Sequence, residues 1–161
     1  MLAFQRPLCE RHGFLAGQPL RELENLSLSF NSGVELCNRT HLRLSLAFFS
    51  NMDKLKGLSL YNVLVKGGAM PACMSALADL GLWDNDLECM PDLQHCSSLS
   101  HVSVCGQPAN MAAMDSSMDL ALYPTLRRVY LSENQAGKRL AEHLKEQAQA
   151  LDRQVIIKLY R

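Results

Sequence analysis

The sequence predicts an α/β fold in which short strands form one parallel sheet and helices or loops return the chain between strands. Three observations indicate this fold. A spacing of leucine residues recurs along the chain, apolar residues alternate with small or polar ones within each copy, and a segment near residue 140 carries apolar residues at helical spacing. Strands that repeat with a return between them run in the same direction and pair in parallel.

The repeated spacing is clearest between Leu77 and Leu87, in LADLGLWDNDL. Leucines occupy its first, fourth, sixth and eleventh places, and asparagine its ninth. The first three of these apolar places recur in five copies, whose first positions are separated by 32, 22, 22 and 27 residues. Those first positions are Leu23, Leu55, Leu77, Leu99 and Leu126. Asparagine stands at the ninth place in three copies, and Val63 and Gln107 stand there in the other two.

This spacing resembles that of the leucine-rich repeat family, whose pattern is L-x-x-L-x-L-x-x-N/C-x-L at a period of about 20–29 residues. The five matches extend from residue 20 to about residue 135. The resemblance implies a solenoid with a parallel sheet on its concave face and helices and loops on its convex face. Members of the family serve as inhibitors, substrate receptors of ubiquitin ligases, immune sensors and scaffold subunits.

Simple strand geometry accounts for the pattern. The fourth and sixth places are two residues apart and face the same side of a strand, toward the interior, whereas the third, fifth and seventh places face the other way. One such turn cannot bury its apolar face alone, but stacked turns share a core. At the ninth place, a buried asparagine amide can satisfy backbone groups where the strand ends and the chain bends.

The C-terminal part predicts a helix followed by a last strand. Asn134 and Gly137 precede residues 138–153, where apolar residues form one stripe and charged residues lie opposite. This order resembles the ribonuclease-inhibitor type of repeat. The apolar stripe consists of Leu140, Ala141, Leu144, Ala148 and Leu151. The alternating residues of the last strand are Val155, Ile157 and Leu159.

We expect a single domain over residues 1–161, with an N-terminal cap in 1–19 and about five to six repeats in 20–161. The copies of 22 residues are too short for a full helix, so loops or 3₁₀ turns should return the chain there. Three methionines at helical spacing, which we assign to core packing, are Met111, Met114 and Met118.

Residues 32–52 allow two interpretations. An extra irregular turn can pass through Leu42, Leu44 and Leu46, or a longer helix on the convex face can end near Phe48 and Phe49. We favour the helix, because a strand through Leu44 would begin close to the next repeat at Leu55.

The outward positions form columns when neighbouring strands lie about 4.8 Å apart. The third places are Asn25, Gly57, Asp79, His101 and Arg128; the fifth are Ser27, Ser59, Gly81, Ser103 and Tyr130; the seventh are Ser29, Tyr61, Trp83, Cys105 and Ser132. The single tryptophan of the chain therefore falls on the open face beside Tyr61. The alternative is that Trp83 is covered by the N-terminal segment or by a loop.

Exposed aromatic side chains on a concave face are common anchors of protein interfaces. We therefore predict a protein-binding face with Trp83 and Tyr61 as anchors and charged or polar side chains that set orientation. The predicted partner-binding residues are Tyr61, Asp79, Trp83, His101, Arg128 and Tyr130. No catalytic residue, cofactor or metal is predicted.

Composition narrows the class of protein. Lys+Arg and Asp+Glu number 16 each, so the chain lacks the positive excess expected for phosphate-backbone binding. No apolar stretch approaches the roughly 20 residues of a membrane span, and Arg6, Glu10 and Arg11 do not fit a secretory signal. The six cysteines lack C-x-x-C spacing, which indicates thiols in a reducing compartment. We expect an intracellular, cytoplasmic protein and leave a mitochondrial location open.

A zinc site from His95, Cys96, His101 and Cys105 is disfavoured. Four strand residues separate His101 from Cys105 by about 13 Å, which is too far for one ion or for a nucleophile and its base. Asp84, Asp86 and Glu88 lack the glycine and distant glutamate of a calcium loop.

We therefore predict a non-enzymatic protein-interaction module, such as a scaffold, adaptor or complex subunit. One alternative is a regulator of a small GTPase, for which Arg128 is the only candidate charge. Another is a subunit of a ribonucleoprotein, with basic side chains as phosphate contacts. Those basic side chains are Lys54, Lys56, Arg127 and Arg128.

Overall fold

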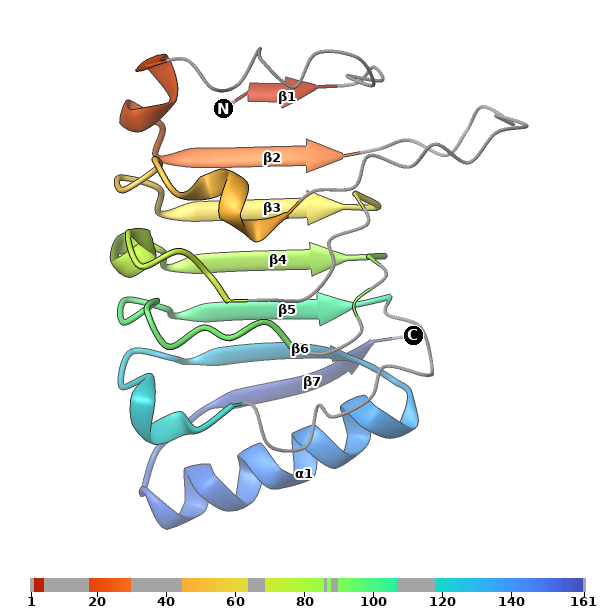
Figure 1. The fold of residues 1–161 in the computed structure, drawn as a ribbon. Coiled ribbons are helices and arrows are strands. Elements are labelled where there is room, and N and C mark those ends of the chain that lie inside the picture. The colour runs from red at the N-terminus through yellow and green to blue at the C-terminus, as the bar shows by residue number, and fades with distance from the viewer. Residues whose placement is uncertain are drawn as a thin grey trace, which may run out of the picture.

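The chain forms an α/β fold with one parallel sheet, as a computed structural model describes it for residues 2–4, 18–29, 45–63, 69–85, 87, 90–106 and 118–160. Seven strands follow one another in the sheet in chain order (Figure 1). The strands are β1 (Leu2–Phe4), β2 (Asn25–Ser29), β3 (Gly57–Tyr61), β4 (Asp79–Trp83), β5 (His101–Cys105), β6 (Arg128–Ser132) and β7 (Ile156–Tyr160). The helices are α1 (Gln135–Ala150) and the 3₁₀ helices η1 (Gln18–Glu22), η2 (Leu46–Phe49), η3 (Met74–Ala76) and η4 (Leu120–Leu122).

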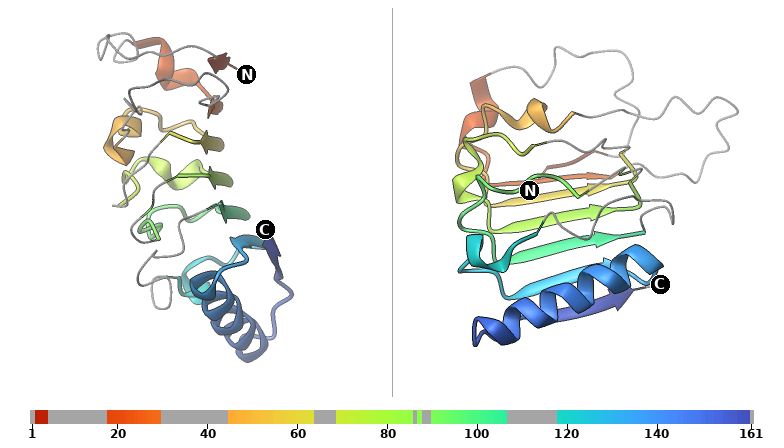
Figure 2. Two further views of the ribbon diagram at one scale, coloured as in Figure 1. Left: turned by 90° about the vertical axis from the view of Figure 1, so that its right-hand side faces the viewer. Right: turned by 60° about the horizontal axis from the view of Figure 1, so that its bottom comes forward.

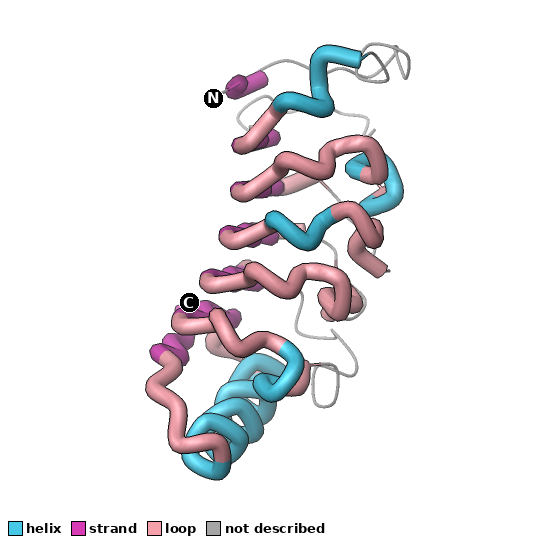
Figure 3. The backbone as a smooth tube through the Cα atoms, turned by 90° about the vertical axis from the view of Figure 1, so that its left-hand side faces the viewer, coloured by secondary structure: helices cyan, strands magenta, loops and turns pink. Residues whose placement is uncertain are grey.

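The strands lie on one side of the molecule, and the 3₁₀ helices and α1 lie on the other (Figures 2 and 3). Each described return segment therefore crosses the same face of the sheet before the next strand begins. We call the opposite side, formed by the third, fifth and seventh places, the open face. Within the described part of the chain, no helix is both long and apolar enough to cross a bilayer.

The strands pair in the register that the leucine pattern predicts. Leu26 lies beside Leu58, and Leu58 lies beside Leu80. The same column continues through Val102, Val129 and Ile157. A shift by one residue would turn every buried side chain of a strand outward, so burial of one face fixes the register.

Inward positions of β2 to β6 are buried as predicted, whereas in the last strand Ile157 is partly buried and Leu159 is 37% exposed. Leu80 is 2% exposed and Leu82 is fully buried. Leu58 and Leu60 in β3, like Leu126 before β6, belong to the same apolar core. Full burial of a leucine side chain contributes about 1.5–3 kcal/mol relative to exposure. The buried inward residues therefore supply the main stabilisation of the packed copies.

A tight turn that the leucine pattern does not contain precedes each strand from β2 to β6. The first-position N–H of each copy donates to the carbonyl oxygen three residues earlier, over 3.0–3.2 Å. The accepting residues are Leu20, Met52, Met74, Cys96 and Tyr123. Except for the partly buried Leu20, their side chains belong to the buried core. Such turns shorten the return path, which explains how copies of 22 residues close with 3₁₀ turns, as predicted.

A residue with positive φ follows each of three strands. The residues directly after β3, β4 and β5 are Asn62, Asp84 and Gly106, and all three have positive φ, between 50° and 67°. Asn, Asp and Gly adopt this left-handed conformation at lower cost than other residues. A side chain at residue 106 would also collide with the Asp84 side chain. The chain therefore bends away from the sheet at the same place in each of these copies.

Asn85 bears out the role predicted for the ninth place. Its side chain is buried, its Oδ1 accepts from the Val63 N–H at 2.9 Å, and its Nδ2 donates to the Leu60 carbonyl at 2.9 Å. The amide of one copy thus satisfies two backbone groups of the preceding copy. These two hydrogen bonds connect adjacent copies beyond the ends of the strands, where the backbone hydrogen bonds of the sheet stop.

The last turn is built around α1. The Asn134 side chain accepts from the Gly137 N–H at 2.8 Å and caps the helix, and a Cβ at Gly137 would collide with the Ser132 carbonyl. The guanidinium of Arg153 donates to four carbonyl oxygens of the segment that precedes β6. Those acceptors are Leu120, Tyr123, Pro124 and Leu126. The segment after α1 therefore holds the return path that leads into β6.

Several sequence predictions change in detail. Residues 1–19, predicted only as a cap, contain β1, which pairs with β2, and the start of η1. Leu151 is exposed rather than part of the buried stripe, because α1 ends at Ala150. The longer helix favoured for residues 32–52 does not end at Phe49 as predicted: only the four-residue 3₁₀ helix η2 lies there, after an extended Ser45, and residues 32–44 lie outside the described residues. Met118 is buried, as predicted, whereas Met111 and Met114 lie outside the described residues.

Removal of the Asn85 amide should destabilise the fold. The Asn85→Ala variant leaves a buried N–H and a buried carbonyl without their partner, which we expect to lower the free energy of unfolding by about 2–4 kcal/mol. Urea denaturation followed by circular dichroism measures the change. Asn51→Ala, at an exposed position, is the matched control and should stay within about 0.5 kcal/mol of wild type. Equal stability of the two variants would contradict the bridging role of Asn85.

Stability should fall in alkaline solution. Burial is the main reason that the pKa of the Cys96 thiol and that of the Tyr123 hydroxyl are each raised to about 12. Their ordinary pKa values are 9.0 and 10.0, so between these values and pH 12 the unfolded chain binds fewer protons than the native chain. The free energy of unfolding therefore decreases as pH rises through this window.

Urea denaturation between pH 7 and about pH 11 tests this dependence. The Cys96→Val variant should show a shallower decline, because one of the two groups no longer titrates. An unfolding free energy that stays constant above pH 9 would show that neither group keeps its proton in the native state.

Candidate functional site

The predicted binding residues share the open face and lie in the predicted columns. At the third place, Asp79 pairs in register with His101, and His101 pairs with Arg128. At the seventh place, Tyr61 pairs with Trp83. Tyr130, at the fifth place, pairs with Ser103.

A hollow of about 610 Å³ lies on the open face. Its lining comes from β2 to β6 and joins four of the six predicted residues. The outward-facing lining residues are Asn25, Ser27, Gly57, Ser59, Asp79, Gly81, Trp83, His101, Ser103 and Tyr130. Tyr61 and Arg128 do not line the hollow.

Two glycines shape the floor of the hollow. A Cβ at Gly57 would come within 2.5 Å of Asn25 Oδ1, so the amide oxygen of Asn25 lies over Gly57. A Cβ at Gly81 would lie 3.1 Å from Trp83 Nε1, so the indole lies over Gly81. The side chains of Asn25 and Trp83 thus lean into space that any larger residue would fill.

A polar cluster forms one wall. His101 Nδ1 lies 2.8 Å from Asp79 Oδ1 and 2.8 Å from Ser100 Oγ. The Ser100 hydroxyl donates to the Ala78 carbonyl at 3.1 Å, so it can accept from the imidazole. Both contacts are satisfied when Nδ1 carries the proton, which orients the ring and leaves Nε2 for other partners.

Two aromatic side chains, Trp83 and Tyr130, also line the hollow, and with Tyr160 they form an aromatic cluster. The Tyr160 ring makes edge contacts with Trp83 at 6.3 Å and with Tyr130 at 5.4 Å between centroids. Aromatic pairs at these separations and angles are favourable. Residues of β4, β6 and β7 are therefore joined across the open face by these three rings.

The exposure predicted for three outward positions is wrong. Ser103, Cys105 and Ser132 lie in the outward columns, yet all three are buried, and Cys105 is only 2% exposed. The three rings come from β4, β6 and β7, the part of the sheet in which these small side chains lie. Trp83 itself is half-buried, and its ring contacts that of Tyr160 in the last strand.

Tyr160 is absent from the predicted site. Its strand follows a helix and does not carry the leucine pattern, so the pattern does not assign Tyr160 to an outward column. The alternation of Val155, Ile157 and Leu159 nevertheless places Tyr160 on the opposite side of β7 from these residues. That alternation was the available signal, but it does not predict that the ring reaches Trp83.

Tyr61 stands apart from the ring cluster. It is 42% exposed, and its hydroxyl is hydrogen-bonded to the Asp84 carboxylate. This bond and the negative charge of Asp84 raise the pKa of Tyr61. Tyr61 therefore offers an exposed ring whose hydroxyl is already oriented.

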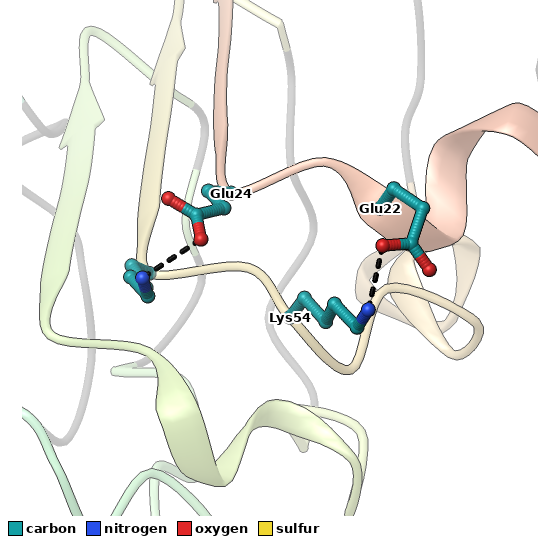
Figure 4. Close-up of polar contacts among 4 residues, drawn as sticks. Glu22, Glu24 and Lys54 are labelled. Atoms are coloured by element: carbon teal, nitrogen blue, oxygen red, sulfur yellow. Dashed lines mark hydrogen bonds and ion pairs between the residues drawn. The ribbon is translucent and has the colours of Figure 1, made fainter.

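Figure 4 shows that two of the basic side chains considered for phosphate contact are paired with carboxylates. Lys54 Nζ lies 2.6 Å from Glu22 Oε2, and Lys56 Nζ lies 2.8 Å from Glu24 Oε1. The pairing lowers the pKa of Glu24 and raises that of Lys54. Both pairs are exposed and contribute little to stability, but they reduce the local positive charge.

The residues considered for a zinc site do not lie together in the structure. Cys96 is buried in the core beneath the sheet, whereas His101 and Cys105 point to the open face. Among the residues that the structure describes, no three His, Cys, Asp or Glu side chains lie close enough to hold a metal ion. No disulfide joins the described cysteines, Cys73, Cys96 and Cys105, to one another.

No family model matches the chain, and neither does any curated protein or solved structure. The function is therefore inferred from the geometry of the open face.

The Tyr61–Asp84 contact can be tested by titration. Asp84→Asn should lower the pKa of Tyr61 toward its ordinary value, because the negative charge is lost while asparagine tolerates the positive φ of residue 84. Ultraviolet difference spectra of tyrosinate formation measure the shift, and Tyr61→Phe identifies the component. Asp53→Asn, another exposed carboxylate, is the control. Identical titration curves for wild type and Asp84→Asn would contradict the contact.

Proposed function

We propose that this chain is a leucine-rich-repeat solenoid that binds a protein partner on its open face, as a scaffold, adaptor or subunit of a larger assembly. The hollow walled by Trp83 and Tyr130 is the observation that carries the proposal. Its size falls within the usual range for sites that accept a side chain or small ligand. The module acts by binding and has no catalytic role.

The repeat assignment is supported by two recurring features and by one bridge between copies. Strands of five residues pair without a register shift, tight turns recur three residues before each first position, and the ninth-place Asn85 bridges two copies. These are the features that allow a short unit to bury its apolar face only against a neighbour. The open face is then the side available for a partner.

The binding roles follow from position and exposure. Trp83, Tyr130 and Tyr160 form an aromatic surface that a partner can bury at low entropic cost, since each ring has few rotatable bonds. Asp79 and His101 also line the hollow and orient the partner. Tyr61 and Arg128 extend the surface beyond the hollow.

Comparative affinity capture tests the proposal. A partner retained by wild-type protein should bind about 30-fold more weakly to Trp83→Ala, since loss of a central aromatic anchor costs about 2 kcal/mol. Leu122→Ala removes an exposed leucine from η4 on the return side and is the matched control. Circular dichroism verifies that each variant folds, and Trp83→Phe provides a milder change.

Three outcomes would overturn the proposal. The partner can bind Trp83→Ala and Tyr61→Ala as well as wild type, which places the interface elsewhere. The captured molecule can be a nucleic acid whose binding collapses with added salt. The protein can stimulate GTP hydrolysis in a manner lost with Arg128→Ala, which would make it a GTPase regulator.

A further inference from the structure

The hollow has the chemistry of a site for a cationic side chain. Among the residues that the structure describes, its lining includes one carboxylate, that of Asp79, and neither lysine nor arginine. The side chain of Asp79 is largely exposed, and its Oδ1 contacts His101 Nδ1. The Trp83 indole and the Tyr130 phenol provide aromatic rings, whose faces attract cations. The hollow therefore combines negative charge with aromatic rings.

Further acceptors surround the position of Asp79. Asn25 Oδ1 lies over Gly57, between the strands that carry Asn25 and Asp79. Neighbouring strands lie about 4.8 Å apart, so the amide oxygen above Gly57 lies about one strand spacing from the position of Asp79. Ser27 and Ser59 add hydroxyl oxygens to the floor.

The indole of Trp83 borders the same part of the hollow as the Asp79 carboxylate. Asp79, Gly81 and Trp83 alternate along the open face of β4, and the indole leans back over Gly81. Same-face residues of a strand are about 6.6 Å apart, so the ring and the carboxylate border one space. Its Nε1 is near Ser59 Oγ, since both lie within 3.4 Å of the same point above Gly81.

We propose that this hollow binds an arginine side chain of the protein partner, with the guanidinium against the Trp83 indole and paired with Asp79. This inference rests on the proposed function and names the partner residue that the site accepts. Arginine is favoured over lysine because its planar group stacks on an indole and presents five donors in a fixed geometry. Those donors match the oxygens of Asp79, Asn25 and the two serines.

The basic residues nearby do not occupy the hollow. Arg128 is the register partner of His101 but does not line the hollow. Lys158 pairs with Tyr130 from β7, one strand further from the hollow. The Lys56 ammonium is held by Glu24. The positive charges around the site therefore lie at its margin, and the carboxylate lies within it.

The single tryptophan makes the site directly observable. We expect Nα-acetyl-arginine amide to change Trp83 fluorescence saturably, with a dissociation constant on the order of 1 mM for a ligand of this size. Nα-acetyl-citrulline amide, which has the same shape without the charge, should bind at least about fivefold more weakly, as expected when a close charge pair is lost.

Substitutions assign the contact to the carboxylate. Asp79→Asn should abolish the preference for arginine over citrulline, whereas Asp53→Asn, an exposed carboxylate outside the hollow, should retain it. The same titration with Nα-acetyl-lysine amide should give weaker binding than arginine. Equal binding of arginine and citrulline, or loss of the preference in both variants, overturns the inference.

The failures of the two proposals are distinguishable. A protein partner lost in Trp83→Ala, together with no arginine preference in the fluorescence titration, overturns the arginine site and sustains the binding face. Arginine binding that depends on Asp79, together with a partner indifferent to Trp83, sustains the arginine site and overturns the proposed function.

Discussion

The structure depends on the inability of any one strand and its return segment to bury their apolar side chains alone. Each inward side chain is covered only when the equivalent side chains of neighbouring copies lie beside it in the same register. This requirement fixes the parallel direction and the register of the strands, because any shift exposes a whole apolar column. The hydrophobic effect thus determines where every other residue of the sheet must lie.

Backbone polar groups outside the sheet ladder are satisfied by short-range hydrogen bonds that are compatible with this register. Asn85 bridges to the preceding copy, and the first-position N–H groups form tight turns. At the C-terminal end, where no further copy follows within the described residues, α1 covers the core and Arg153 ties the preceding segment to it. Buried polar groups left without partners would offset the gain from apolar burial, so these contacts are as necessary as the leucines.

The same constraint builds the open face. Since burial fixes the inward residues, the alternate residues are forced into aligned outward columns that the core leaves free to vary. Small residues at Gly57 and Gly81 create space, and their larger neighbours lean into it. The resulting hollow carries an acidic and imidazole cluster and an aromatic cluster. Its shape is a consequence of stacking, whereas its chemistry is set by residues that the core does not require.

The sequence alone determined the parallel strands, their register, the buried leucine and valine positions of β2 to β6 and the role of Asn85, because all of these follow from a two-residue alternation and a repeated spacing. It also placed Asp79, Trp83, His101 and Tyr130 on one face. Only the tertiary structure decided that Tyr160 contacts Trp83 and Tyr130 and that Cys105, in an outward column, is buried. That contact joins strands three positions apart in the sheet, so it depends on the path of the last strand and the reach of long side chains. Spacing along the chain determines which face a residue occupies, but it does not contain the distances between side chains of separate strands.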